Sequence, residues 1–282
     1  MSLWKVELLH LFRGWRGWTL IAAFLFATGM SVLISFLIDR NDDDPFPYSQ
    51  TLEIYARFTV LAYMLFIGLI VSSLSFDSNK DLSTFLRLRF SVQRILITKI
   101  LVFMVIVNGL FLLSFALTFA FATMFFDSTD RISFGWMLWG LFFQLVSSLF
   151  YVALVLFTAA VFKGAVASVL LTLGVVIGIP IISGLLMILE ILIRGIEMMP
   201  GIVLEDVSYV AKVMVWWPAT TGDAQAFLTV TESEIATSTI SGVFGQPFEL
   251  DPYFRIKPLI TSLVAAPLLA VIAWRTYSRR EM

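Results

Sequence analysis

The sequence predicts an all-α, polytopic membrane protein with six transmembrane helices. Of its 282 residues, 59% are hydrophobic and only 14% are charged, which is more apolar than a soluble domain of this length tolerates. Six apolar runs lie near or above the length of about 20 residues that crosses a bilayer. Basic residues gather in alternate connecting segments, which orients the predicted helices.

The six apolar runs are Trp18–Ile38, Ile54–Leu74, Ile100–Phe126, Phe134–Val161, Val166–Ile193 and Leu259–Trp274. The third, fourth and fifth runs exceed the length that spans the bilayer, so these helices should tilt, bend or extend beyond it. In the fifth run, Pro180 removes a backbone hydrogen bond and predicts a kink near Gly178. We treat residues 1–282 as a single transmembrane domain.

The charge distribution predicts that both termini lie inside the cell. With this orientation the inner segments carry 12 of the 19 basic residues and four of the 20 acidic residues. The outer loops carry acidic residues, including Asp42, Asp43 and Asp44. Basic residues on the inner side of spans are the main determinant of topology.

Two segments outside the spans have a predicted place. Residues 2–16 form a short interfacial helix, with Trp4, Leu8, Leu11, Phe12 and Trp15 on one side and Lys5, Arg13 and Arg16 reaching lipid headgroups. The apolar run that follows is too long for the core of a cleaved signal peptide, so we expect an uncleaved first span. Residues 194–257 form a long extracytoplasmic loop.

Residues 76–94, between the second and third spans, form a charged amphipathic segment. Ser78 and Asp81 fit a helix start of the capping-box type. Apolar Leu82, Phe85, Leu86 and Phe90 recur near helical spacing, while Asp81, Thr84, Arg87, Arg89 and Arg94 are polar or charged. Two interpretations stay open: a cytoplasmic helix that presses on a soluble partner, and an interfacial linker whose arginines bind lipid phosphates.

The order of these elements resembles the permease subunit of a type 2 ABC transporter of the exporter group. In that family a cytoplasmic coupling helix is commonly followed by Pro-Val-Ser-Arg, a few apolar residues and Gly-Lys. The counterpart here runs from Arg89 to Lys99; Ser91, the apolar residues 95–97 and Lys99 match. Proline, arginine and glycine are replaced by Arg89, Val92 and Thr98, so the architecture carries more of the likeness than the local motif.

The resemblance implies a permease with a separate ATPase subunit and a second permease copy, identical or homologous, in a multi-pass cell membrane such as the cytoplasmic membrane of a prokaryote. It also implies that coupling to the ATPase involves Asp81, Thr84, Phe85, Leu86, Arg87, Arg89 and Arg94. The chain itself lacks a Walker A motif, Gly-x-x-x-x-Gly-Lys-Ser/Thr, so we expect no ATP hydrolysis by that route. We expect no cofactor, no metal and no nucleic acid partner.

Polar residues within the spans offer further candidates. Glu190 is followed by Arg194 at i+4, which favours a structural pair over a functional carboxylate. Arg57 should reach the interface, and Gln144, Ser147 and Ser148 share a helix face that can bond a neighbouring helix. Close helix packing is predicted at Gly174, Gly178 and Pro180, where a GxxxG pattern lies.

Several function classes remain as alternatives. A stand-alone channel or secondary transporter would need ionisable residues near mid-membrane, and the sequence has almost none. An enzyme is disfavoured because no catalytic motif is present; the sole histidine, His10, cannot form a metal site alone. A solvated loop is favoured over a cation site for Asp42, Asp43 and Asp44. A non-transporting scaffold stays open, and the sequence favours an exporter of an apolar or amphipathic substrate.

Overall fold

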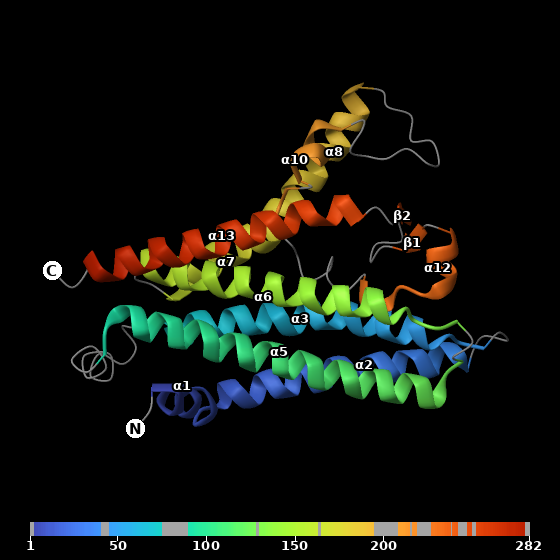
Figure 1. The fold of residues 1–282 in the computed structure, drawn as a ribbon, viewed down its shortest axis with the longest axis horizontal. Helices are drawn as coiled ribbons and strands as arrows, with labels where there is room; N and C mark the ends of the chain where they lie inside the picture. Colours follow the sequence, from blue (N-terminus) through green and yellow to red (C-terminus); the bar gives the residue numbers. More distant parts are fainter. Residues whose placement is uncertain are drawn as a thin grey trace.

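The computed structural model describes residues 3–40, 45–74, 90–127, 130–162, 165–194, 208–214, 216–218, 227–237, 239–241, 247–249 and 252–279. Within these residues, six helices are long and apolar enough to cross a membrane. They lie along one another in an elongated bundle, except that the second half of the fifth diverges from it (Figure 1). The prediction of six apolar spans is confirmed, and the architecture fits a multi-pass membrane protein.

The six spans comprise α2 (Trp15–Asp39), α3 (Tyr48–Leu74), α5 (Val92–Phe125), α6 (Phe134–Val161), the interrupted helix α7 (Ala165–Leu173) to α8 (Ile179–Arg194), and α13 (Pro252–Arg279). The fourth span has the predicted bounds. α5 begins at Val92 rather than at Ile100, because Ser91 caps its N-terminus by accepting a hydrogen bond from the Arg94 backbone N–H at 3.4 Å. Arg94 therefore belongs to the first turn of α5, and the predicted helix over residues 76–94 cannot continue unbroken to 94.

The helix α6 lies at the centre of the packing. It contacts α13, α5, α3 and α7, and 72% of its most apolar stretch is buried. A large apolar cluster joins α2, α3 and α5 through rings such as those of Phe24, Tyr55 and Phe111. These contacts make α2, α3, α5 and α6 one packed body, which we call the packed bundle.

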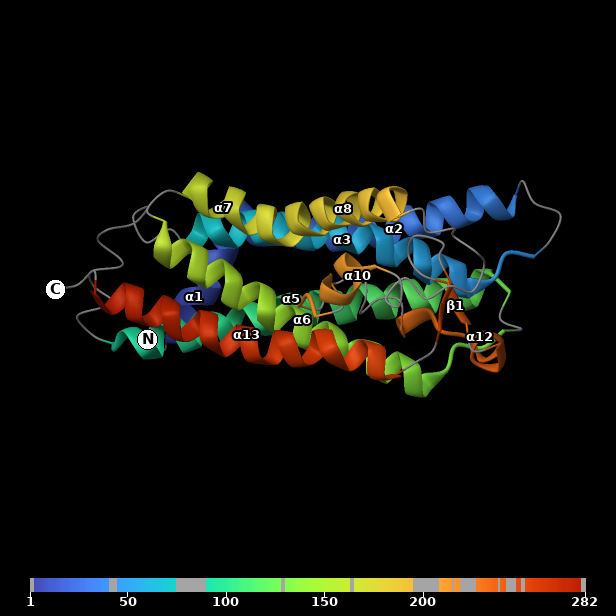
Figure 2. The ribbon, with the colours of Figure 1, turned by 90° about the horizontal axis from the view of Figure 1, so that it is seen from above.

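One end of the bundle carries α1 (Leu3–Phe12) and the C-terminal end of α13. In Figure 1 α1 is seen nearly end-on, and in Figure 2 it runs across the long axis of the bundle. The elbow between α1 and α2 is tight, because a Cβ on Gly17 would meet the Phe12 ring at 2.5 Å. We call this end the α1 end.

The opposite end carries the short elements η3 (Phe227–Thr229), α12 (Glu232–Thr237), β1 (Thr239–Ser241) and β2 (Pro247–Glu249), and β1 pairs antiparallel with β2. A further short helix, α10 (Tyr209–Met214), lies against α8. Phe227 of η3 stacks on Trp136 of α6 with ring centres 5.6 Å apart. Because α13 already begins at Pro252, the predicted loop over residues 194–257 is shorter at its C-terminal side.

The fifth span is interrupted where the sequence predicts a kink. Residues Gly174–Gly178 form a π-helical turn, η2, in which the Ile179 backbone N–H donates to the Gly174 carbonyl. Pro180 follows directly and has no N–H to restore the α-helical ladder. Beyond this turn, α8 leaves the bundle together with α10 (Figure 1).

Candidate functional site

An ion pair buried at the α1 end joins α1 to α5. The Lys99 Nζ atom lies 2.9 Å from the Glu7 Oε2 atom, and the two side chains are only 9% and 6% exposed. Glu7 lies on the face of α1 that also buries Leu3 and Leu11, at positions i, i+4 and i+8 of one helix stripe. Removing one partner of such a pair leaves a buried charge, which is far more costly than removing both.

Apolar side chains surround the same junction. Leu3 of α1 and Ile95 of α5 are buried against each other, with Val6 and Phe90 packed beside them. Phe90 lies just before α5, and the Arg94 guanidinium lies over its ring, 5.6 Å from the ring centre. The residues that lead into α5 are therefore held against α1.

This junction covers only the edge of the predicted coupling site. Asp81, Thr84, Phe85, Leu86, Arg87 and Arg89 lie outside the described residues. Arg94 lies exposed on the first turn of α5. The sequence predicts no role for Glu7, and it indicates Lys99 only through the family pattern. The pairing of the two residues is not predicted, because 92 positions separate them and no local spacing indicates the contact.

Midway along the bundle, α5 and α6 share polar contacts. The Asn108 side-chain amide donates to the Ser148 hydroxyl and to the Met104 carbonyl, both at 2.9 Å. This confirms the predicted bond from Ser148 to a neighbouring helix. Ser147 instead donates to the Phe143 carbonyl of its own helix at 3.0 Å.

The prediction for Gln144 is wrong. Its side chain is buried, and among the described residues neither its amide nitrogen nor its amide oxygen has a hydrogen-bond partner. An unpaired buried amide costs free energy that a paired one does not. The sequence indicates that Gln144 must face protein, but the partners depend on the rotation of α6, which the sequence does not define.

A second polar cluster joins α2, α3 and α5. The Tyr55 and Ser114 hydroxyls lie 2.6 Å apart, and Thr118 donates to the Thr28 hydroxyl at 3.1 Å. All four side chains are buried. Sequence analysis missed this cluster, although serine and threonine at i and i+4 within a span, as at 114 and 118, are a usable signal.

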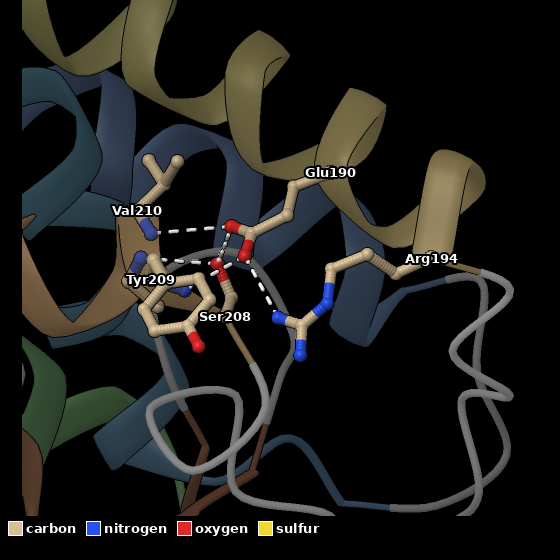
Figure 3. Close-up of polar contacts among 6 residues, drawn as sticks. Glu190, Arg194, Ser208, Tyr209 and Val210 are labelled. Carbon is tan, nitrogen blue, oxygen red and sulfur yellow. Dashed lines mark hydrogen bonds and ion pairs between the residues drawn. The ribbon is translucent and has the colours of Figure 1, made fainter.

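Where α8 leaves the bundle, Glu190 gathers the polar contacts of α8 and α10 (Figure 3). Its carboxylate accepts from the Ser208 hydroxyl at 2.7 Å, from the Tyr209 and Val210 backbone N–H groups at 2.9 and 3.2 Å, and from the Arg194 guanidinium at 3.0 Å. The predicted pair of Glu190 with Arg194 is confirmed. The contacts to α10 lie across the loop and were not predicted.

Further contacts fix α10 beside α8. Ser208 accepts from the Ala211 backbone N–H at 3.1 Å and so caps α10. Two cations lie over the Tyr209 ring, the Arg194 guanidinium carbon 5.0 Å and the Lys212 Nζ atom 5.7 Å from its centre. We call α8, α10 and these contacts the outer arm.

The remaining predicted candidates are distributed elsewhere. Arg57 pairs with Glu53 at 2.6 Å while its side chain stays 55% exposed; its place near the membrane interface stays a prediction. Gly174 and Gly178 have no atom of another described element within 4 Å of where a Cβ would lie, so the close helix packing predicted there is not made among the described residues. Asp42, Asp43 and Asp44 lie outside the described residues.

Comparison with known proteins adds no relative: no family model, no curated protein and no solved structure matches the chain.

Proposed function

We propose that the chain is the permease subunit of an ATP-driven ABC exporter, which moves an apolar or amphipathic substrate across a cell membrane. A separate ATPase subunit supplies the energy, and a second permease copy, identical or homologous, completes the pathway. The α1 end faces the cytoplasm. The observation that carries the proposal is the junction at this end, where one buried ion pair and an apolar cluster tie α1 to the start of α5.

This junction suits the transmission of a mechanical signal. The segment over residues 76–91 leads directly into α5, and α5 reaches the far end of the bundle as a single helix of 34 residues. A displacement at the first turn of α5 would therefore move α1 and the whole length of α5 together, because packed elements shift as units. A partner that displaces residues 76–91 would therefore also displace α1 and α5.

The surface also leaves room for a second copy. The exposed side chains of the fifth span are almost all apolar, among them Leu170, Ile182 and Leu185. Both α2 and α7 contact α3, so the first and fifth spans flank the same helix. In Figure 2 they lie on the same side of the bundle. Gly174 and Gly178, open within one chain, are available there to a second chain.

The decisive experiment changes the apolar side of the predicted coupling helix. Phe85 and Leu86 lie outside the described residues, and the sequence places both on that side. In the variant Phe85→Asp/Leu86→Asp, buried charge should abolish retention and stimulation of the ATPase by a tagged permease, while insertion in the membrane stays normal. The control Phe85→Leu/Leu86→Met keeps apolar character and should retain the ATPase.

The two interpretations of the segment separate in this experiment. If residues 76–94 only anchor lipid, the ATPase stays bound to the Asp variant and the defect follows the anionic lipid content. Normal ATPase binding and transport by the Asp variant would refute the coupling assignment. If no protein with a Walker A motif is recovered with the unaltered chain from its own membranes, the proposal of an ABC permease fails as a whole.

Orientation is tested independently in the natural background, which contains no cysteine. Ser83→Cys should resist an impermeant thiol reagent added outside intact cells, and Glu232→Cys in α12 should react, since Glu232 is exposed at the opposite end. The reverse pattern would place the α1 end outside.

A further inference from the structure

The α1 end carries a surface that combines tryptophans with basic side chains. Trp15 and Trp18, in the first turn of α2, are 67% and 65% exposed, and Trp4 of α1 is also exposed. Lys5 and Arg13 on the same stretch of chain are also exposed, and Arg16 is half-buried. Tryptophan favours the headgroup level of a bilayer, where lysine and arginine meet lipid phosphates. We call these six residues the elbow surface.

The direction of α1 suits this level. α1 runs across the bundle axis while α2 runs along it (Figure 2), and the two helices meet at Gly14, which has extended backbone geometry. The buried stripe of α1 faces the bundle, so Lys5 and Leu9 face away from it. A short helix that crosses the bundle axis at this end lies in the interface plane and not through the membrane.

The buried ion pair keeps the negative charge of Glu7 away from the elbow surface. Glu7 is the only acidic residue in positions 1–38, and it lies buried with Lys99. Because Lys99 of α5 neutralises Glu7, the basic residues of α1 and α2 do not pair with it. The elbow surface is left with three cationic side chains and no exposed carboxylate from the first 38 residues.

We propose that the elbow surface is a binding site for the headgroups of anionic phospholipids. Lys5, Arg13 and Arg16 bind the headgroup and phosphate oxygens, and Trp4, Trp15 and Trp18 hold the site at headgroup depth. The pair of Glu7 with Lys99 keeps a repelling carboxylate out of the site. The proposal needs the chain to lie in a membrane and does not depend on an ATPase partner.

The test uses the purified full chain and two probes, phosphatidylglycerol and phosphatidylcholine, in mixed micelles. Native mass spectrometry counts the lipids that each variant retains. The variant Arg13→Gln/Arg16→Gln should lower the preference for phosphatidylglycerol by roughly tenfold or more, since each basic residue near an anionic surface contributes a factor of about five. Millimolar inorganic phosphate should not displace the lipid.

A matched control distinguishes a site from a generally cationic end. Arg275 and Arg279 are exposed near the C-terminal end of α13, at the same end of the bundle. The variant Arg275→Gln/Arg279→Gln loses the same charge away from the tryptophans and should keep most of the preference. An equal loss in both double variants, or no loss in the elbow variant, overturns the proposal.

The masking of Glu7 has its own test. Leu9→Glu places an unpaired carboxylate on the exposed side of α1 and should weaken phosphatidylglycerol binding. Glu7→Leu/Lys99→Met removes both charges of the buried pair and should leave the preference within about twofold of the parent, because a paired, buried carboxylate adds little field at the surface. If Leu9→Glu binds phosphatidylglycerol as well as the parent, charge at the elbow does not select lipid and the proposal is wrong.

Discussion

Helix α6 and the fifth span have similar lengths, but α6 is mostly buried and the fifth span is mostly exposed. In α6, 72% of the most apolar stretch is buried, and in the fifth span 11% is buried, although the fifth span is the more apolar of the two. Both helices bury polar side chains. α6 buries Gln144, Ser147, Ser148 and Thr158, and the fifth span buries Ser168, Thr172 and Ser183, while its exposed positions are almost entirely apolar.

The comparison shows that hydrophobicity does not decide which helix occupies the interior of such a bundle. Lipid solvates an apolar side chain as well as protein does, so burial of apolar surface gives little reason to choose a helix. A hydroxyl or amide needs a partner that lipid cannot supply. Thr158 shows the consequence, because its hydroxyl lies 2.8 Å from that of Thr172 on α7.

The two regions should also differ in stability. The packed bundle is held by buried contacts on many sides, and the outer arm beyond η2 is held mainly by the carboxylate of Glu190 and its neighbours. Changes in the packed bundle should alter global unfolding. Changes in the outer arm should alter local opening, which involves only part of the structure.

The largest effect is expected for Lys99→Met at the α1 end. Glu7 would stay buried without its partner, and the loss of one partner of a buried ion pair costs about 3 to 5 kcal/mol. The thermal unfolding midpoint in detergent should fall markedly, and α1 should become accessible to protease. The variant Glu7→Leu/Lys99→Met should recover most of the stability; an equal loss in the single and double variants would show that the ion pair itself is not responsible.

A smaller effect of opposite sign is expected for Gln144→Leu. The substitution removes two unpaired polar atoms from the bundle and should stabilise it by about 1 kcal/mol or more. Asn108→Leu is the matched control, because Asn108 has bonded partners at 2.9 Å. It should destabilise the protein by about 0.6 to 2 kcal/mol.

Unfolding midpoints of the two variants, measured in the same detergent, check both signs. A fall in stability for Gln144→Leu as large as that for Asn108→Leu would mean that Gln144 is bonded in the folded protein. If Gln144→Leu is more stable and the protein loses activity, the unpaired amide serves a second conformation or a bound molecule.

The sequence predicted the features that depend on length and local spacing. The six spans follow from apolar length, and the contact of Glu190 with Arg194 follows from one helical turn. The interruption of the fifth span follows from Pro180, although its π-helical form does not. Ser148 was assigned correctly because a polar side chain in a span must find a partner on a neighbouring helix.

The features that the sequence did not predict depend on how distant helices rotate and pair. Glu7 meets Lys99 across 92 positions, and Thr28 meets Thr118 across 90. Each residue has several helical neighbours that would satisfy it equally well. Ser208 and Tyr209 reach Glu190 from the far side of a loop, where no periodic pattern applies.

The smallest global effect, and the sharpest contrast, is expected for Glu190→Ala in the outer arm. The substitution removes the acceptor for the Tyr209 and Val210 backbone N–H groups and the partner of Ser208 and Arg194. Hydrogen exchange of the amides in 209–214 should therefore accelerate strongly. The global unfolding midpoint should stay close to the parent, because the arm buries little apolar surface.

Two further variants make this result specific. Glu190→Gln keeps an acceptor oxygen and loses the charge, so it should exchange at an intermediate rate. Glu53→Ala breaks the other described i,i+4 pair, with Arg57, and should leave exchange in 209–214 unchanged. If Glu190→Ala lowers the unfolding midpoint as much as Lys99→Met, the outer arm unfolds together with the bundle, and the division of the molecule into a packed bundle and a separately opening arm is wrong.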